Sequence, residues 1–229
     1  MKSETQAARM TGILFIAATG AAIVSGYFLL PTLEASDYLT QISANHTPVM
    51  LGALFYFIMA AAGASIAIPM YPILKKHNES MALGAVGFRI IEGAIFMVGV
   101  FLVMSLLPLS QGFVDAGAPA DSAFQTLGEI LVAGYTIDHA VVPAVFAFSI
   151  GALMYYLIFY QSKLVPRWLS VWGIIGILLG VSNGLIDMFG GVPIETVSML
   201  LDLPIFVNEM VLAIWLIVKG FNTSAIKPE

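Results

Sequence analysis

The sequence predicts an all-α integral membrane protein, a bundle of six transmembrane helices that forms a single domain over residues 1–229. Two observations carry this prediction. Hydrophobic residues make up 59% of the 229 residues and charged residues 10%, against roughly 45–50% and 25% in soluble domains. Six apolar runs are also long enough to cross a bilayer core, which takes about 20 helical residues. They cover residues 10–30, 48–74, 81–107, 137–160, 168–189 and 203–221.

The composition also argues against several classes of function. The chain has no cysteine, which excludes a disulfide framework, a thiolate metal site and a thiol nucleophile. A net charge of −5 with nine Lys and Arg residues argues against nucleic acid as a partner, because such binding needs a basic surface. No P-loop, G-x-G-x-x-G or G-x-S-x-G sequence is present, so nucleotide use and serine acyl transfer lack support. We predict no cofactor.

Turn-forming and charged residues mark the ends of the apolar runs. The first run follows Arg9 and continues to Leu30, which is too long for the core of a signal peptide, so we expect a true span. Proline cannot continue a helix, and prolines mark four of the edges: Pro31, Pro48, Pro108 and Pro166.

The connection over residues 109–136 is the longest one. Its first part, with Gly112 and Gly117, is typical of a loop. After Ser122, apolar residues recur every three to four positions, at Phe124, Leu127, Leu131 and Tyr135. This spacing predicts a short amphipathic helix on the outer surface before the fourth span, where it could act as a lid. The alternative is that the fourth transmembrane helix starts early and projects from the membrane.

Three glycines at a spacing of four follow one face of the fifth span, at Gly176, Gly180 and Gly184. Small residues let neighbouring helices approach closely within lipid. The stripe therefore predicts tight packing within the chain, or a surface for a homo-oligomer or a partner subunit.

The charges predict the orientation of the chain. Basic residues precede the first span, lie between the second and third and between the fourth and fifth, and follow the sixth. All these positions fall on one side of the membrane, and the connections on the other side contain acidic residues and no Lys or Arg. Because cytoplasmic loops are enriched in basic residues, we predict that both termini are cytoplasmic.

Three charged residues lie inside the predicted spans. Counted from the cytoplasmic ends at 1.5 Å per residue, Arg89 lies roughly 11 Å deep and Glu92 and Glu209 roughly 15 Å. Arg89 and Glu92 are one helical turn apart and can pair, and Glu209 can reach the same guanidinium from the sixth span. The cluster is either an ion-pair clasp or, with Asn208, a substrate-binding site whose spare acid takes a cation or a proton.

A second polar group is expected near the outer face, made of His46, Asp138, His139, Asn183 and Asp187. Imidazoles and carboxylates together can hold zinc and activate water. The spacing matches no known zinc motif, so we predict no metal here, and the group is an outer polar cluster of candidate function.

Four segments resemble a bacterial family, domain-of-unknown-function family 4386. They are residues 8–15 (ARMTGILF), 88–92 (FRIIE), 164–169 (LVPRWL) and 215–220 (WLIVKG), and the resemblance covers nearly the whole chain. It implies a multi-pass protein of the bacterial cytoplasmic (inner) membrane and carries no established activity. The positions that match the family pattern are Arg9, Arg89, Glu92, Pro166, Arg167, Glu209, Trp215 and Lys219.

Three functions remain open at this point. The leading one is a polar cavity within the membrane that binds or transports a small amphiphile, a lipid or a cation. Its site is the group Arg89, Glu92, Asn208 and Glu209 near the middle of the bilayer, called the midplane cluster below. The second is an intramembrane enzyme that acts on a lipid-like substrate at the outer interface, with Asp138, His139 and Asp187 as its reactive groups. The third is a non-catalytic accessory subunit. Membrane lipids are expected partners in each case.

Overall fold

A computed structural model describes residues 2–119, 122–135, 142–189 and 195–225. Within these ranges the chain is helical and contains no strand. The helices, in chain order, are α1 (Lys2–Leu33), α2 (Tyr38–Ala44), α3 (His46–Ser65), α4 (Ala67–Leu74), α5 (Glu79–Asp115), α6 (Ala123–Tyr135), α7 (Val142–Ser162), α8 (Arg167–Met188), α9 (Glu195–Val218) and the 3-10 turn η2 (Thr223–Ala225).

Six helical segments are long and apolar enough to cross a membrane, which confirms the predicted number of spans. They are α1, the continuous pair α3 and α4, α5, α7, α8 and α9. Large hydrophobic side chains cover the outside of these helices, including Phe101 at 73% exposure and Val218 at 68%. Such a surface is stable against lipid and not against water. The protein is therefore a multi-pass membrane protein.

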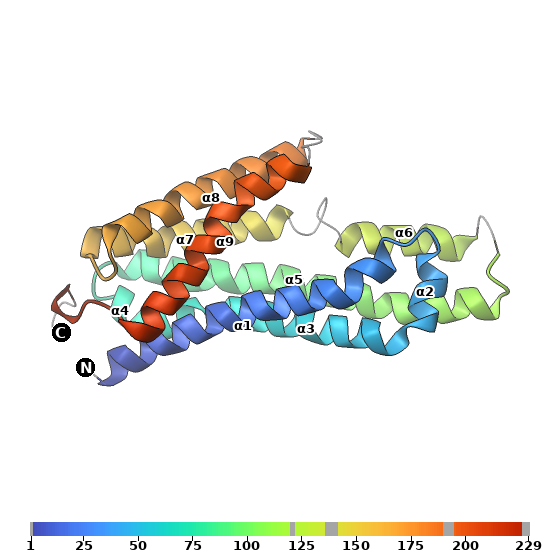
Figure 1. Ribbon diagram of the computed structural model, residues 1–229, viewed down its shortest axis with the longest axis horizontal. Helices are drawn as coiled ribbons and strands as arrows, with labels where there is room; N and C mark the ends of the chain where they lie inside the picture. The colour runs from blue at the N-terminus through green and yellow to red at the C-terminus, as the bar shows by residue number, and fades with distance from the viewer. Residues whose placement is uncertain (1, 120–121, 136–141, 190–194, 226–229) are drawn as a thin grey trace.

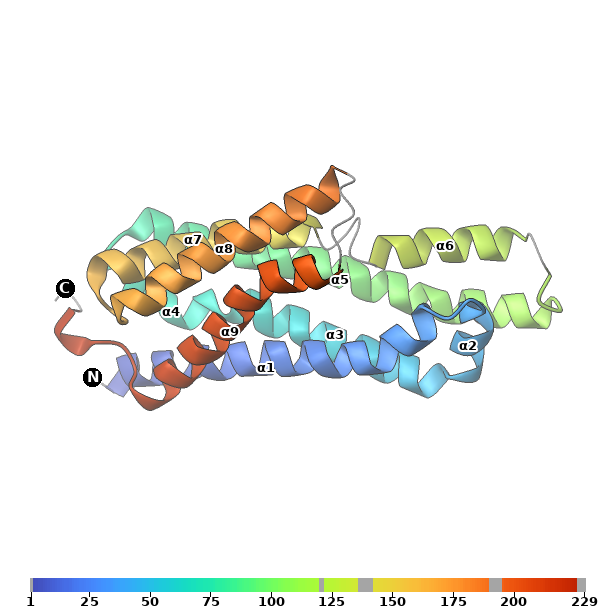
Figure 2. The same cartoon turned by 45° about the horizontal axis from the view of Figure 1, so that its top comes forward.

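The helices form an elongated bundle with both termini at one end (Figure 1). At that end α7, α8 and α9 pack with α1, α4 and α5 around a large apolar core centred on Tyr155, Tyr156 and Phe159. Helices α1, α3 and α5 continue past α7 and α8 to the other end, where α2 and α6 cover them (Figures 1 and 2). A second, smaller core fills that end, around Leu29 and Val103.

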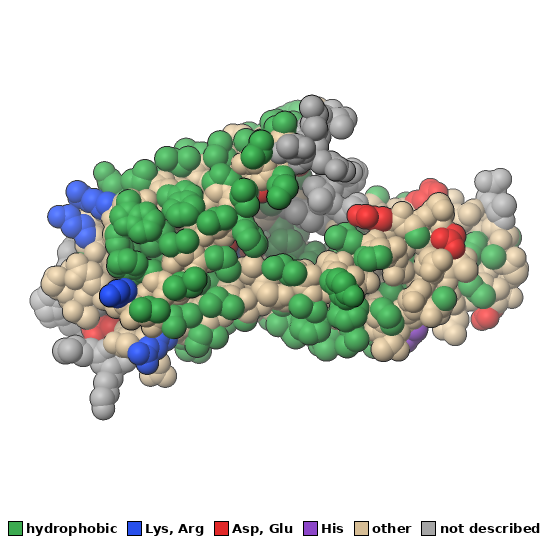
Figure 3. Space-filling model, in the orientation of Figure 1, with side chains coloured by type: hydrophobic (Ala, Val, Ile, Leu, Met, Phe, Trp, Pro, Cys, Tyr) green, Lys and Arg blue, Asp and Glu red, His purple; other side chains and the backbone are tan. Residues whose placement is uncertain are grey.

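Basic side chains gather at one end of the bundle. Figure 3 shows Lys and Arg at the end that holds the termini, with an acidic side chain beside them, and several further Asp and Glu side chains around the other end. Hydrophobic side chains cover most of the surface between them. The basic segments therefore share one end, as the sequence predicts, and their cytoplasmic placement remains a prediction.

The third span is longer than expected. Pro108 and Gly112 were predicted to lie at and beyond its end, but α5 continues through both to Asp115. Proline removes one helical hydrogen bond, and this loss is offset here because α2 and α6 pack against the last turns of α5. The helix ends where Gly117 takes a left-handed φ of 82°, a conformation that glycine adopts at little cost.

The amphipathic helix before the fourth span is confirmed as α6, which lies lengthwise along α5 (Figure 2). Its Leu131, Val132 and Tyr135 pack on the second core. Apolar burial against α5 and α2 therefore holds this helix. The start of the fourth span at residue 137 lies outside the described residues, and α7 is described from Val142.

The glycine stripe of the fifth span packs within the chain. A Cβ added at Gly176 would lie 2.8 Å from the backbone nitrogen of Ile205, so α8 and α9 are in direct backbone contact there. Gly184 faces Phe146 of α7. Of the two alternatives, this geometry favours packing within the chain, and an oligomer or partner surface remains a prediction.

Candidate functional site

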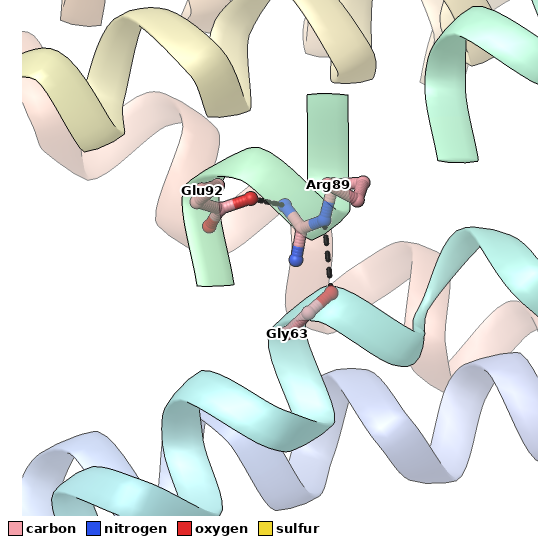
Figure 4. A network of polar contacts seen from close by, with 3 residues as sticks. All are labelled: Gly63, Arg89 and Glu92. Atoms are coloured by element: carbon pink, nitrogen blue, oxygen red, sulfur yellow. Dashed lines mark hydrogen bonds and ion pairs between the residues drawn. The ribbon is translucent and has the colours of Figure 1, made fainter. Parts of the chain in front are cut away.

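The centre of the candidate site is an ion pair buried between the membrane-spanning helices (Figure 4). Nη1 of Arg89 lies 3.1 Å from Oε2 of Glu92, and the two residues are 3% and 7% exposed. The two atoms form an ion pair but no hydrogen bond, since Oε2 of Glu92 has no hydrogen-bond partner within the described residues. The pairing predicted from the spacing of one helical turn is confirmed.

Arg89 also ties α5 to the second span. Its Nε donates a hydrogen bond to the carbonyl oxygen of Gly63 at 3.0 Å (Figure 4), and its guanidinium lies 5.2 Å from the ring centre of Phe148. Cations over aromatic faces are attracted by the negative charge of the ring face. The guanidinium is thus engaged by a carboxylate, a carbonyl and a ring.

Gly63 lies just before an interruption of the second span. Helix α3 ends at Ser65 and α4 begins at Ala67. The backbone of Ile66 stays helical, with φ −55° and ψ −43°, and its N–H bonds the Gly63 carbonyl. Pro69 lacks the N–H that would bond the Ser65 carbonyl, which accounts for the irregular turn. Sequence reasoning missed Gly63 as a partner of Arg89, although Pro69 within an apolar run is a signal for an irregular turn.

Glu209 reaches the same layer from α9. It lies nine residues before the end of the span at Val218, roughly 14 Å along the helix, and it is close enough to interact electrostatically with both Arg89 and Glu92. Its Oε1 is buried without a hydrogen-bond partner. The ion pair of Arg89 is made with Glu92, so Glu209 is a neighbour of that pair.

Tyr155 of α7 stands beside Glu209. The two groups interact, yet neither the Tyr155 hydroxyl nor Oε1 of Glu209 makes a hydrogen bond of good geometry. Buried polar groups are nearly always satisfied. Two adjacent unsatisfied groups therefore indicate a place for a proton, a water molecule or a small ligand. Sequence reasoning missed Tyr155, which is one of many aromatic residues in the spans.

Asn208 has a different environment from its neighbour Glu209. Its Oδ1 accepts a hydrogen bond from the Tyr156 hydroxyl at 2.5 Å, and its Nδ2 donates to the carbonyl oxygen of Leu169 at 3.0 Å. Asn208 is fully buried. It therefore joins α9 to α7 and α8 and holds Glu209 in position.

The predicted outer cluster is brought together in part. Asn183 is buried and donates a hydrogen bond to Oδ2 of Asp202 at 2.9 Å, and Asp187 interacts electrostatically with the same carboxylate. Sequence reasoning missed Asp202 as the partner of Asn183. His46 is exposed at the start of α3, at the far end of the bundle beyond α8 (Figure 1).

Asp138 and His139 lie outside the described residues. Within the described ranges, no three His, Asp or Glu side chains form a group suited to a metal ion. The intramembrane-enzyme alternative therefore stays a prediction, and the midplane cluster is the candidate site whose geometry the structure describes.

Comparisons with known proteins match the chain to a family. No curated protein and no solved structure matches the chain. The family described as a domain of unknown function (DUF4386) matches residues 10–220, which include the Arg89–Glu92 pair, Glu209, most of the first span and the other five spans. This six-span membrane protein belongs to the DUF4386 family.

Proposed function

We propose that the protein binds a small ligand with a single positive charge at Glu209, in exchange for a proton, within the bilayer. The ligand is a monovalent cation or the cationic head of a small amphiphile. The membrane is the bacterial cytoplasmic membrane, with both termini inside.

One observation carries the proposal: the Glu209 carboxylate is buried, its Oε1 makes no hydrogen bond of good geometry, and the nearby Arg89 is already paired with Glu92. A buried carboxylate without a full countercharge is costly to keep ionised. The group is stable when it carries a proton or when a cation lies against it. An acid that alternates between these two states is the usual basis of proton-coupled binding inside membranes.

The charge count of the cluster supports a monovalent ligand. Arg89 contributes +1, and Glu92 and Glu209 contribute −1 each when ionised, so the sum is −1. Because Arg89 is engaged by Glu92 and the Gly63 carbonyl, it is not available to neutralise Glu209 fully. One proton or one monovalent cation brings the sum to zero, whereas a divalent ion would leave an excess positive charge.

Two further features support exchange of the ligand. The Tyr155 hydroxyl, also without a hydrogen bond, can add a second oxygen beside Glu209. The junction between α3 and α4, where the Ile66 N–H bonds the Gly63 carbonyl at 3.2 Å, is a local irregularity in the second span, and Arg89 contacts it through the same carbonyl. Helices bend most easily at such irregular turns.

Proton release on ligand binding tests the proposal. Purified protein in detergent, weakly buffered with a pH indicator, is titrated with sodium chloride, choline chloride or tetraphenylphosphonium chloride. We expect at least one of these cations to release up to one proton per chain. Glu209→Gln should release none, because an amide has no proton to exchange.

Glu129→Gln is the matched control, since Glu129 is an exposed carboxylate on α6. It should release as many protons as the parent. The proposal is overturned if none of the three cations releases a proton from the parent between pH 5 and 9, or if Glu209→Gln releases as many as the parent.

A further inference from the structure

A basic pocket lies at the end of the bundle that holds the termini, away from the midplane cluster. It is a cavity of about 450 Å³ between the α7–α8 connection and the end of α9, lined by Lys163, Pro166, Arg167, Trp215, Lys219 and Asn222 among others. We propose that this basic pocket binds the phosphate head group of an anionic phospholipid. The inference is independent of the function proposed for Glu209.

The walls of the basic pocket are fixed to each other. The backbone N–H of Asn222 donates to the carbonyl oxygen of Leu164 at 2.8 Å, and its side-chain amide donates to that of Lys163 at 3.4 Å. Phe221 packs against Phe159 of α7 with ring centres 5.9 Å apart. The segment after α9 is therefore joined to the connection before α8, and the cavity between them is a built feature.

The charge of the pocket selects an anion. The described residues that line it include three cations, Lys163, Arg167 and Lys219, and no acidic side chain. Arg167 lies over the ring of Tyr160 at 5.2 Å, which restrains the guanidinium beside the cavity. The backbone at Lys163 has a φ of 60°, a conformation unfavourable for a residue with a side chain. Strain of this kind is often kept at functional sites.

The N-terminus of α8 adds to this selection. Helix α8 has 22 residues and begins at Arg167, directly after Pro166, so its positive dipole end lies at the pocket. Phosphate groups bind well where a helix N-terminus meets Arg and Lys side chains. The pocket therefore suits a phosphate group better than a head group without charge.

The depth of the pocket selects a lipid over a soluble anion. The span of α8 starts at Arg167 and that of α9 ends at Val218, so the pocket lies at head-group level. Trp168, 54% exposed, stacks on Trp172 nearby, and exposed Trp residues are typical of the membrane–water interface. Leu164, Val165 and Phe221 give the cavity apolar walls as well, which the apolar part of an amphiphile can cover and a free phosphate cannot.

Native mass spectrometry tests the proposal with the full chain in detergent, using phosphatidylglycerol as the anionic probe and phosphatidylcholine as the zwitterionic one. We expect phosphatidylglycerol to bind more tightly. The double variant R167Q/K219Q should weaken its binding about 30-fold, from the usual contribution of a basic residue near an anionic head group. The control K75Q/K76Q removes two charges at the same end, outside the described pocket lining, and should leave binding within about twofold.

Two further arms separate the alternatives. The charge-preserving variant R167K/K219R should retain most of the affinity, which shows that a loss in R167Q/K219Q does not come from misfolding. Inorganic phosphate in excess should leave the lipid bound. Equal affinity in R167Q/K219Q and K75Q/K76Q, equal binding of the two lipids, or displacement of phosphatidylglycerol by inorganic phosphate would overturn the proposal.

Discussion

Replacement of Arg89 by alanine tests the role of the buried ion pair. The change removes the partner of Glu92, which is 7% exposed, and the hydrogen bond to the Gly63 carbonyl. Stranding one member of a buried pair costs about 3–5 kcal/mol. A chain of this size loses roughly 2–4 °C of melting temperature per kcal/mol. We therefore expect Arg89→Ala to lower the melting temperature in detergent by roughly 6–20 °C.

The control is Lys75→Ala, which removes an exposed cation at the end of α4 and should change the melting temperature by less than about 4 °C, since surface charges contribute about 0–1 kcal/mol. The double variant Arg89→Ala/Glu92→Gln should be more stable than Arg89→Ala, because the uncharged amide costs less to bury than the stranded carboxylate. Equal melting temperatures for Arg89→Ala and Lys75→Ala, or no recovery in the double variant, would refute the reasoning.

Three further predictions concern packing, hydrogen bonding and orientation. Gly176→Ala should destabilise the protein by about 1–3 kcal/mol because its Cβ would meet the backbone of α9, whereas Gly180→Ala, with its nearest atom at 3.6 Å, should be tolerated in the same thermal assay. Tyr156→Phe should lower the free energy of unfolding by about 1–3 kcal/mol, because the buried Oδ1 of Asn208 on α9 loses its hydrogen-bond donor. Tyr155→Phe should lower it by less than about 1 kcal/mol, because the Tyr155 hydroxyl makes no hydrogen bond of good geometry. The chain has no cysteine, so a single cysteine at the exposed Ala116 should be labelled by an impermeant reagent in intact cells, and protection from labelling there would reverse the predicted orientation.

The number of spans and the Arg89–Glu92 pair could be predicted from the sequence because both depend on spacing along one helix. A span is a run of apolar residues, and two side chains three positions apart share a helix face. The extension of α5 past Pro108 could not be predicted in this way. It depends on tertiary contacts with α6 and with α2, which lies far earlier in the sequence.

The partners of the candidate site were harder to predict for the same reason. The contact of Arg89 with Gly63 requires a particular rotation of α3 against α5, and hydropathy does not determine such rotations. Tyr155 and Asp202 come near their partners only through packing between α7, α8 and α9. Acids within apolar runs could be identified as candidates, whereas the groups that pair with them could not.

The central claim is that Glu209 carries a proton that a cation can replace. Infrared difference spectroscopy of the purified protein between pH 5 and 9 tests it most directly, because a protonated carboxyl has its own carbonyl band. We expect such a band in the parent and in Glu129→Gln, its decrease when the active cation is added, and its absence from Glu209→Gln. A parent spectrum without the band, or a band unchanged in Glu209→Gln, would show that Glu209 holds no exchangeable proton and would leave the midplane cluster as an ion-pair clasp between helices.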